Sequence, residues 1–262
     1  MTVTVRQGGS PLVISFPHVG TDIPDEIAVR MSPAALRLDD TDFDQPGLYD
    51  FAEALDATTL TPRYSRLVID LNRPPDNAPL YPGQNGTGLI PLETFEGERI
   101  YETDPDEAET QRRLETFWRP YHLALSEALA TAVERHGHAL LWDAHSITGV
   151  VPRLFDGALP DLNLGTAEGK ACSPEARAAA WAVCEASGYS AVLDGRFKGG
   201  FITRNYGRPT FGTHAIQMEL CKHTHLADAP PARLDEARCA RLRPVLRGAI
   251  EAALAALEDR KD

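Results

Sequence analysis

The feature that most constrains the fold of this chain is an alternation of short apolar runs with longer segments of helical periodicity. Most apolar runs are continuous, which is typical of strands covered on both faces. The runs predict strands at 11–16, 65–71, 138–144, 189–194 and 214–220. The patterns between them predict helices at 48–55, 114–129, 174–186 and 232–257. This order indicates an α/β fold with a mainly parallel or mixed central sheet flanked by helices.

Prolines and loops refine that expectation. Pro120 and Pro244 lie inside two of the helical patterns and are expected to kink or split them. Two long stretches rich in Pro and Gly, 74–106 and 150–174, show weak periodicity and predict irregular structure. Both leave from strand ends, where open α/β sheets bind their ligands. We therefore expect one domain over 1–262, with its site beneath these two loops.

The charge balance argues against some classes of partner. The 262 residues include 26 Lys and Arg against 38 Asp and Glu, so the formal net charge is −12. That sign opposes nucleic-acid binding, which depends on neutralising phosphates. The start of the chain does not have the pattern of a signal peptide, and no segment approaches the roughly 20 apolar residues of a spanning helix. We expect a cytoplasmic protein that binds neither nucleic acid nor membranes.

Histidines follow two of the predicted strands. His18 comes just after the first, and His145 comes just after the third, two residues beyond Asp143. One such histidine alone is more often structural, but two together favour a metal site. A catalytic zinc takes three ligands from His, Asp or Glu and leaves a fourth position for water. Spacing leaves four candidates for the third ligand, which are Asp39, Asp40, Asp42 and Asp44.

Charged side chains inside apolar runs are the next candidates. Glu219 lies within the run 214–220, where a carboxylate requires either a cationic partner or a role as general base at a metal site. Arg66 lies within the run 65–71, where its guanidinium pairs either with a buried carboxylate such as Asp70 or with a substrate. Each residue therefore has a functional and a structural interpretation.

Basic residues concentrate near the two loops despite the acidic composition. Asn72 and Arg73 stand at the entrance of the first loop, where Arg73 is suited to hold a carboxylate by two hydrogen bonds. The segment GRFKGGFITRNYGRP adds Lys198, Arg204 and Arg208 among glycines. This concentration favours recognition of a small acidic molecule.

Longer strings carry a more specific signal than single residues. The chain resembles the N-formylglutamate deformylase family, also called N-formylglutamate amidohydrolases, through PHVG, YSRLVIDLNRPPDNAPLYPGQNGTGL, LWDAHSI, VPRLFDGALPDLNLGT, GRFKGGFITRNYGRP and HAIQMEL. The resemblance spans essentially the whole chain. It implies a zinc-type amidohydrolase whose α/β fold is related to the metallocarboxypeptidases, of the phosphorylase/hydrolase-like kind. It also implies hydrolysis of N-formyl-L-glutamate to formate and L-glutamate at the end of histidine degradation.

The same resemblance implies roles for the candidate residues. His18, Asp44 and His145 would hold one zinc-type divalent ion, with Asp42 as the alternative to Asp44. Glu219 would act as the general base. Arg66 would support the oxyanion.

The two carboxylates of the substrate require two cationic groups to bind them. The resemblance assigns one carboxylate to Asn72 with Arg73. For the other carboxylate we choose Arg204, with Lys198 and Arg208 as alternatives. Two alternative functions remain. One is a metal-dependent amidohydrolase or carboxypeptidase that acts on another N-acyl acidic amino acid, and the other is a non-catalytic protein that binds an acidic metabolite.

Overall fold

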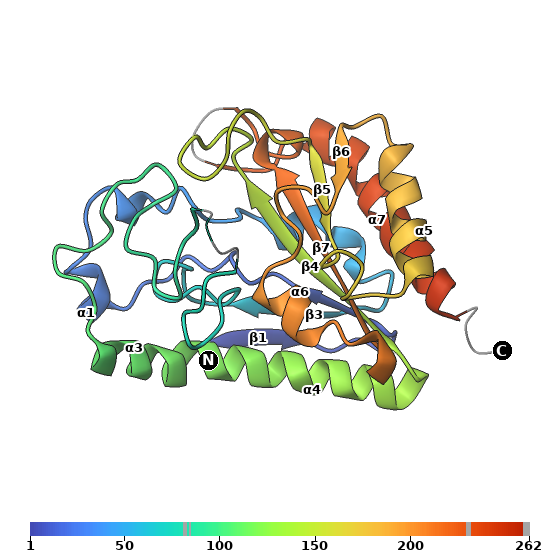
Figure 1. The fold of residues 1–262 in the computed structure, drawn as a ribbon, viewed down its shortest axis with the longest axis horizontal. Coiled ribbons are helices and arrows are strands. Elements are labelled where there is room, and N and C mark those ends of the chain that lie inside the picture. Colours follow the sequence, from blue (N-terminus) through green and yellow to red (C-terminus); the bar gives the residue numbers. More distant parts are fainter. Residues whose placement is uncertain (81–82, 84, 229–231, 259–262) are drawn as a thin grey trace.

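The computed structural model describes residues 1–80, 83, 85–228 and 232–258, and it has a mixed sheet at its centre (Figure 1). The strands are β1 (Val3–Arg6), β2 (Leu12–Ser15), β3 (Thr58–Pro62), β4 (Ala139–Ile147), β5 (Leu162–Gly165), β6 (Ala191–Leu193) and β7 (Thr213–Cys221). Their order across the sheet is β1-β3-β2-β4-β7-β5-β6. Among the described strands, β1 pairs with β3 and β5 pairs with β7 in antiparallel orientation, and the other pairings are parallel. The expected α/β fold with a mainly parallel or mixed sheet is confirmed.

Helices cover both faces of the sheet. The α-helices are α1 (Asp25–Ala28), α2 (Gln45–Leu48), α3 (Glu107–Arg113), α4 (Arg119–His136), α5 (Pro174–Glu185), α6 (Phe201–Tyr206) and α7 (Glu236–Glu258). A π-helical turn, Leu114–Trp118, joins α3 to α4, and short 3-10 turns lie at Ala35–Arg37, Asp50–Ala52, Pro209–Phe211 and Lys222–Thr224. In Figure 1, α5 and α7 lie side by side, and α4 runs along the opposite side of the sheet. Within the described residues, no helix is both long enough and apolar enough to cross a membrane.

Two apolar layers, one on each face of the sheet, form most of the core. Successive residues of β4 point into opposite layers, so Leu140 and Trp142 pack with residues of α5 and α7, while Leu141 packs with residues of α4. Every residue of β2 and β4 is buried. Burial on both faces explains why these strands appear in the sequence as unbroken apolar runs.

The expected strand at 65–71 is wrong, although its apolar residues are buried. The segment forms turns whose carbonyl groups are bonded by side chains. The Tyr101 hydroxyl donates to the carbonyl oxygen of Leu67, and Arg113 Nη1 donates to that of Val68 at 2.8 Å. A buried turn of this kind needs apolar side chains, so hydropathy alone does not separate it from a strand.

Other differences from expectation concern short or weakly patterned elements. The apolar runs do not indicate β1, β3 or β5, and β5 lies inside 150–174, which was expected to be irregular. The expected helix at 48–55 is instead α2 followed by a 3-10 turn. Pro120 is the second residue of α4, directly after the π-helical turn, whereas α7 continues through Pro244 as one helix. The first loop is irregular as expected in its described part, which excludes 81, 82 and 84.

Candidate active site

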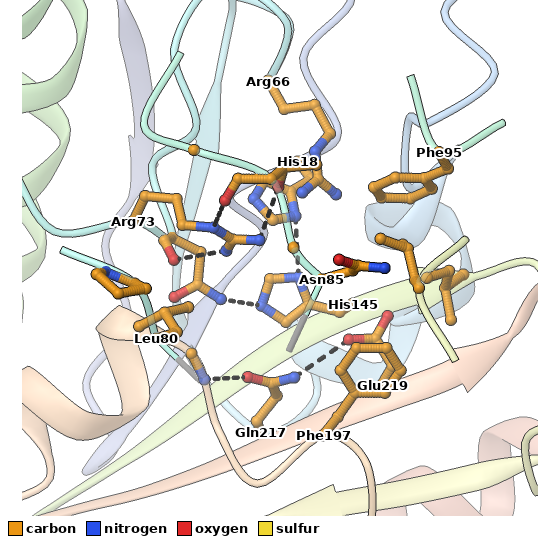
Figure 2. A pocket seen from close by; sticks show the side chains of 18 of the residues that line it. His18, Arg66, Arg73, Leu80, Asn85, Phe95, His145, Phe197, Gln217 and Glu219 are labelled. Atoms are coloured by element: carbon orange, nitrogen blue, oxygen red, sulfur yellow. Dashed lines mark hydrogen bonds between the residues drawn. The ribbon is translucent and has the colours of Figure 1, made fainter. Parts of the chain in front are cut away.

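Two histidines and a glutamate meet at one end of the central strands. His145 and Glu219 occupy paired positions on the parallel strands β4 and β7, which places their side chains on the same face of the sheet. Figure 2 shows His145 between His18 and Glu219. His18 reaches this place from the turn after β2. Gly20 permits that turn, because a Cβ there would lie 2.2 Å from the carbonyl oxygen of Tyr64.

Three donor atoms converge at the centre of the site. His145 Nδ1 lies 3.1 Å from His18 Nδ1 and 3.2 Å from Asp42 Oδ2, and His18 Nδ1 lies 3.5 Å from that oxygen. Ligand atoms about 2.0–2.2 Å from a tetrahedral zinc ion lie about 3.3–3.6 Å apart. Asp42 Oδ1 is also buried and has no hydrogen-bond partner among the described residues. The three buried side chains therefore fit a divalent metal ion in both donor type and spacing.

The other ring nitrogen of each histidine faces a buried carboxylate. His18 Nε2 donates to Asp70 Oδ1 at 2.7 Å, and His145 Nε2 lies 3.1 Å from Asp143 Oδ2. Such partners fix the orientation and tautomer of metal-binding histidines. Burial opposes ionisation of Asp42, yet hydrogen bonds from the two histidines lower its pKa. Burial also opposes a charge on His145, but Asp143 and Asp42 raise the pKa of His145 well above its usual value.

Asp42, and not Asp44, is the carboxylate that meets the histidines. The backbone N–H of Asp42 donates to the carbonyl oxygen of His18 at 3.1 Å and so ties the acidic segment to the histidine turn. Asp44 is exposed, has a left-handed backbone conformation (φ 51°) and directly precedes α2. The expectation for Asp44 as third ligand is therefore corrected to Asp42, the alternative that spacing left open.

Glu219 is buried beside the three-donor group, which consists of His18, Asp42 and His145. Its Oε2 accepts a hydrogen bond from Gln217 Nε2 at 3.1 Å. Burial raises the pKa of Glu219 to about 7, and the positive charge of His145 limits that rise. A carboxyl group with such a pKa is suited to accept and return a proton near neutral pH.

Arg66 pairs with the buried carboxylate that the sequence suggested as its partner. Its Nη2 donates to Asp70 Oδ2 at 2.6 Å, and its guanidinium carbon lies 4.9 Å from the ring centre of Phe95. The same side chain lines the pocket that contains Glu219. Because Asp70 also accepts from His18, one carboxylate orients both a candidate metal ligand and a pocket cation.

Asn72 and Arg73 are held against this site. Asn72 Nδ2 lies 3.0 Å from His145 Nε2. Gly200 permits that arrangement, because a Cβ there would lie 2.4 Å from Asn72 Nδ2. Arg73 donates from Nε to the carbonyl oxygen of Thr87 and from Nη2 to Thr87 Oγ1, each at 2.7 Å. Thus Arg73 joins the end of the turn at 65–71 to the first long loop.

These side chains surround a cavity of about 280 Å³ (Figure 2). Its wall combines the strand ends with residues of both long loops. The arginines and carboxylates in the described wall are Arg66, Arg73, Arg196 and Glu219. Its large apolar residues are Leu80, Phe95, Ile147, Leu154 and Phe197. A small pocket with an apolar wall and a few polar groups is typical of a site for a small molecule.

The basic segment contributes a different residue from those expected. Lys198 pairs with Glu168 at 2.6 Å, and Arg204 and Arg208 are exposed. None of these three cations belongs to the described pocket wall. Helix α6 buries Ile202 and Thr203 and so presents Arg204 to solvent. The substrate contacts expected of Lys198, Arg204 and Arg208 stay predictions, and the described pocket wall gives them no support.

Arg196 takes their place in the pocket wall. Arg196 belongs to the same GRFKGG string. Its position among glycines and beside Phe197 is the sequence feature that could have marked it as a pocket residue. Asp143, two residues before His145, is a second contributor whose role sequence reasoning missed. Strand periodicity could have indicated it, because residues two apart on a strand share a face.

Comparison with known proteins agrees with this geometry. A family model described as N-formylglutamate amidohydrolase matches residues 10–226. The N-formylglutamate deformylases of Pseudomonas putida and Pseudomonas aeruginosa are each 46% identical over 256 residues, which covers 97% of this chain and 96% of each relative. The crystal structure of N-formylglutamate amidohydrolase from Ralstonia eutropha JMP134 has a TM-score of 0.82 at 25% identity and covers 97% of this chain and 98% of that one. The chain therefore belongs to the N-formylglutamate amidohydrolase family, as its motifs predict, and is an enzyme that hydrolyses an amide bond.

Proposed function

We propose that this enzyme hydrolyses N-formyl-L-glutamate to formate and L-glutamate. The observation that carries the proposal is one pocket lined by a buried glutamate, three arginines and the two histidines of the three-donor group, with Asp42 in contact with both histidines. This set provides ligands for a divalent ion, a proton acceptor and positive charge for an acidic substrate. The names of the Pseudomonas relatives support the same substrate.

His18, Asp42 and His145 are proposed to hold one zinc-type ion. Two imidazole nitrogens and a carboxylate oxygen are a ligand set that zinc accepts, and their spacing fits tetrahedral coordination. When bound, such an ion polarises a carbonyl group and lowers the pKa of water. Asp70 and Asp143 keep the two rings oriented through their outer nitrogens.

Glu219 is the proton carrier in this proposal. Its carboxylate takes a proton from the water that attacks the formyl carbon and gives the proton to the amide nitrogen as the C–N bond breaks. Burial, which raises the pKa of Glu219 above that of an exposed glutamate, suits it to both steps. Arg66 stabilises the negative oxygen of the tetrahedral intermediate, and Asp70 holds its guanidinium in place for that role.

Charge in the pocket favours a substrate with carboxylates. The described wall of the pocket contains three arginines and one carboxylate, that of Glu219. This excess of positive charge contrasts with the acidic composition of the whole chain. Asn72 contacts His145, and Arg73 donates to the carbonyl oxygen of Asn72, so we assign this pair the α-carboxylate, which lies next to the reacting amide. A single amidohydrolase domain over 1–262, a role in histidine degradation and a cytoplasmic location stay predictions.

Purified protein should release formate from N-formyl-L-glutamate in a reaction that requires metal. Treatment with a strong chelator is expected to abolish turnover, and zinc is expected to restore it. Elemental analysis should find one divalent ion per chain, because the described residues contain one three-donor group. Preferred turnover of another N-acyl acidic amino acid would favour the first alternative function. Binding of the substrate without any turnover would favour a non-catalytic protein.

Asp143→Asn is expected to weaken metal binding about 10–100-fold, the usual effect of removing a carboxylate partner of a metal-binding histidine. The amide removes the negative charge beside His145 Nε2 and so no longer favours the ring tautomer that exposes Nδ1. Competition with a chromophoric chelator measures the affinity. Asp22→Asn, which changes a half-exposed partner of Arg63, is the matched control. Unchanged affinity in the Asp143 variant would contradict its role.

A further inference from the structure

The π-helical turn joins α3 and α4 into one continuous rod (Figure 1). In this turn the N–H of Arg119 donates to the carbonyl oxygen of Leu114, five residues earlier. The next residue, Pro120, has no N–H for the bond that a regular helix would make to Thr116. The turn therefore accommodates one residue more than a regular α-helix does, and such turns are frequent at functional sites.

The extra residue changes which side chains share a face of the rod. Residues three or four apart lie on one face of a regular α-helix. Arg113 and Trp118 are five apart, yet both bond backbone carbonyl groups of the turn at 65–71 or of the residues that follow it. Trp118 Nε1 donates to the carbonyl oxygen of Arg73 at 3.0 Å. His122 Nε2 donates to that of Leu71 at 2.9 Å. The π-helical turn thus aligns three donors along one stretch of chain.

The direction in which His122 donates is fixed by its surroundings. A carbonyl oxygen only accepts, so Nε2 carries the proton in the bond to Leu71. Burial lowers the pKa of His122 to about 4, so the ring is neutral near pH 7. Its Nδ1 then accepts from the Tyr206 hydroxyl at 3.0 Å. Trp118 stacks on the same ring, with ring centres 3.7 Å apart. The ring therefore holds its position and its tautomer.

The two carbonyl groups that Trp118 and His122 bond lie on either side of Asn72. Asp70 Oδ1 accepts from the backbone N–H of Asn72 at 2.8 Å and from His18 Nε2 at 2.7 Å. The Asn72 side chain points to the other histidine. Its Nδ2 lies 3.0 Å from the Nε2 atom of that ring, His145. One short stretch of chain therefore contacts the outer nitrogens of both histidines in the three-donor group.

We propose that Trp118 and His122 are positioning residues, which hold Asp70 and Asn72 where these side chains orient His18 and His145. This inference rests on the metal site in the proposed function. Neither Trp118 nor His122 belongs to the described pocket wall, so each acts through the backbone of the turn. Groups of a site must be held within about 0.5 Å of their productive geometry, so a small displacement of the turn affects the metal ligands.

His122→Phe and Trp118→Phe test the proposal, because each removes a donor and keeps an aromatic ring. We expect each variant to bind zinc about 3–10-fold more weakly, a smaller loss than the 10–100-fold for a direct partner of a metal-binding histidine. His122→Gln keeps an N–H near the position of Nε2 and should bind zinc within about twofold of the unmodified enzyme. Competition with a chromophoric chelator measures the affinities at a temperature where each variant is folded.

Ser173→Ala is the control for a loss of stability alone. Ser173 Oγ accepts from the N–H of Ala176 at 3.2 Å and caps α5. Its own N–H donates to His214 at the start of β7, away from Glu219 near the end of that strand. Loss of this cap should lower the melting temperature by about 2–4 °C and leave zinc affinity unchanged.

The zinc affinities decide between positioning and general support of the fold. If the Phe variants are less stable but bind zinc as tightly as the Ser173→Ala control, their hydrogen bonds only support the fold and the proposal is overturned. A Gln variant as weak as His122→Phe would show that the donor at residue 122 has no positioning role. If His122→Phe does not fold, Trp118→Phe and His122→Gln carry the same comparison.

A second measurement depends on neither metal nor substrate. The Nε2 proton of His18 is buried in its bond to Asp70, and NMR follows its exchange with water. We expect exchange about tenfold faster in His122→Phe than in Ser173→Ala. If the unmodified protein binds zinc but releases no formate, the proposed function fails and the zinc affinities still judge the inference. If it binds no zinc, the metal site fails and exchange decides: faster exchange supports positioning by His122, and equal exchange overturns it.

Discussion

Glu219→Gln should lower kcat by roughly 10²–10⁴-fold, the usual range for loss of a general base. The amide keeps the shape of the side chain, and its oxygen still accepts the hydrogen bond from Gln217, but it does not take a proton from water. Substrate KM and metal content should change little, because neither the three-donor group nor the pocket arginines are altered. Steady-state kinetics and elemental analysis on the same preparation measure these quantities.

The melting temperature of this variant tests the structural interpretation of Glu219. If Glu219 were the ion-pair partner of Arg66, its neutralisation would leave a buried charge unpaired and destabilise the fold by about 3–5 kcal/mol. The structure instead pairs Arg66 with Asp70, so we expect a melting temperature close to that of the unmodified enzyme. Glu127→Gln, on the exposed face of α4, is the control. A destabilised variant that retained its activity would refute the role as base.

Sequence reasoning succeeded where residue type and periodicity carry the information. Two histidines that directly follow apolar runs favour a metal site, and a glutamate inside an apolar run requires a partner or a function, and these two signals indicated His145 and Glu219 without knowledge of the register. The register then placed them side by side on β4 and β7. The same reasoning gave the layered α/β fold, since continuous apolar runs specify strands buried on both faces.

The failures arise where side-chain contacts override local pattern. The apolar segment 65–71 became a buried turn because Tyr101 and Arg113, far along the chain, bond its carbonyl groups. Arg196 and Arg204 belong to one basic string, but the start of α6 between them decides which one reaches the pocket. These outcomes depend on tertiary contacts that hydropathy and spacing do not contain.

Asp42→Asn should weaken metal binding by more than the roughly 10–100-fold expected for a ligand's hydrogen-bond partner, because it removes an anionic donor. Asp42 Oδ2 lies within 3.5 Å of both histidine Nδ1 atoms, so its charge is part of what would hold the cation. Activity should be nearly absent after dialysis and should return only in part at high zinc concentration. Titration with zinc against a competing chelator gives the affinity, and formate release gives the activity.

Asp44→Asn separates the effect of position from the effect of local charge. Asp44 is exposed and its side chain makes no capping bond at the start of α2, so the substitution should change stability by less than about 0.5 kcal/mol and leave metal affinity unaltered. Two aspartates only two residues apart should therefore respond very differently. That contrast follows from the hydrogen bond between Asp42 N and the carbonyl oxygen of His18, which directs one side chain inward. Greater loss of metal in the Asp44 variant would show that the three-donor group is not the metal site.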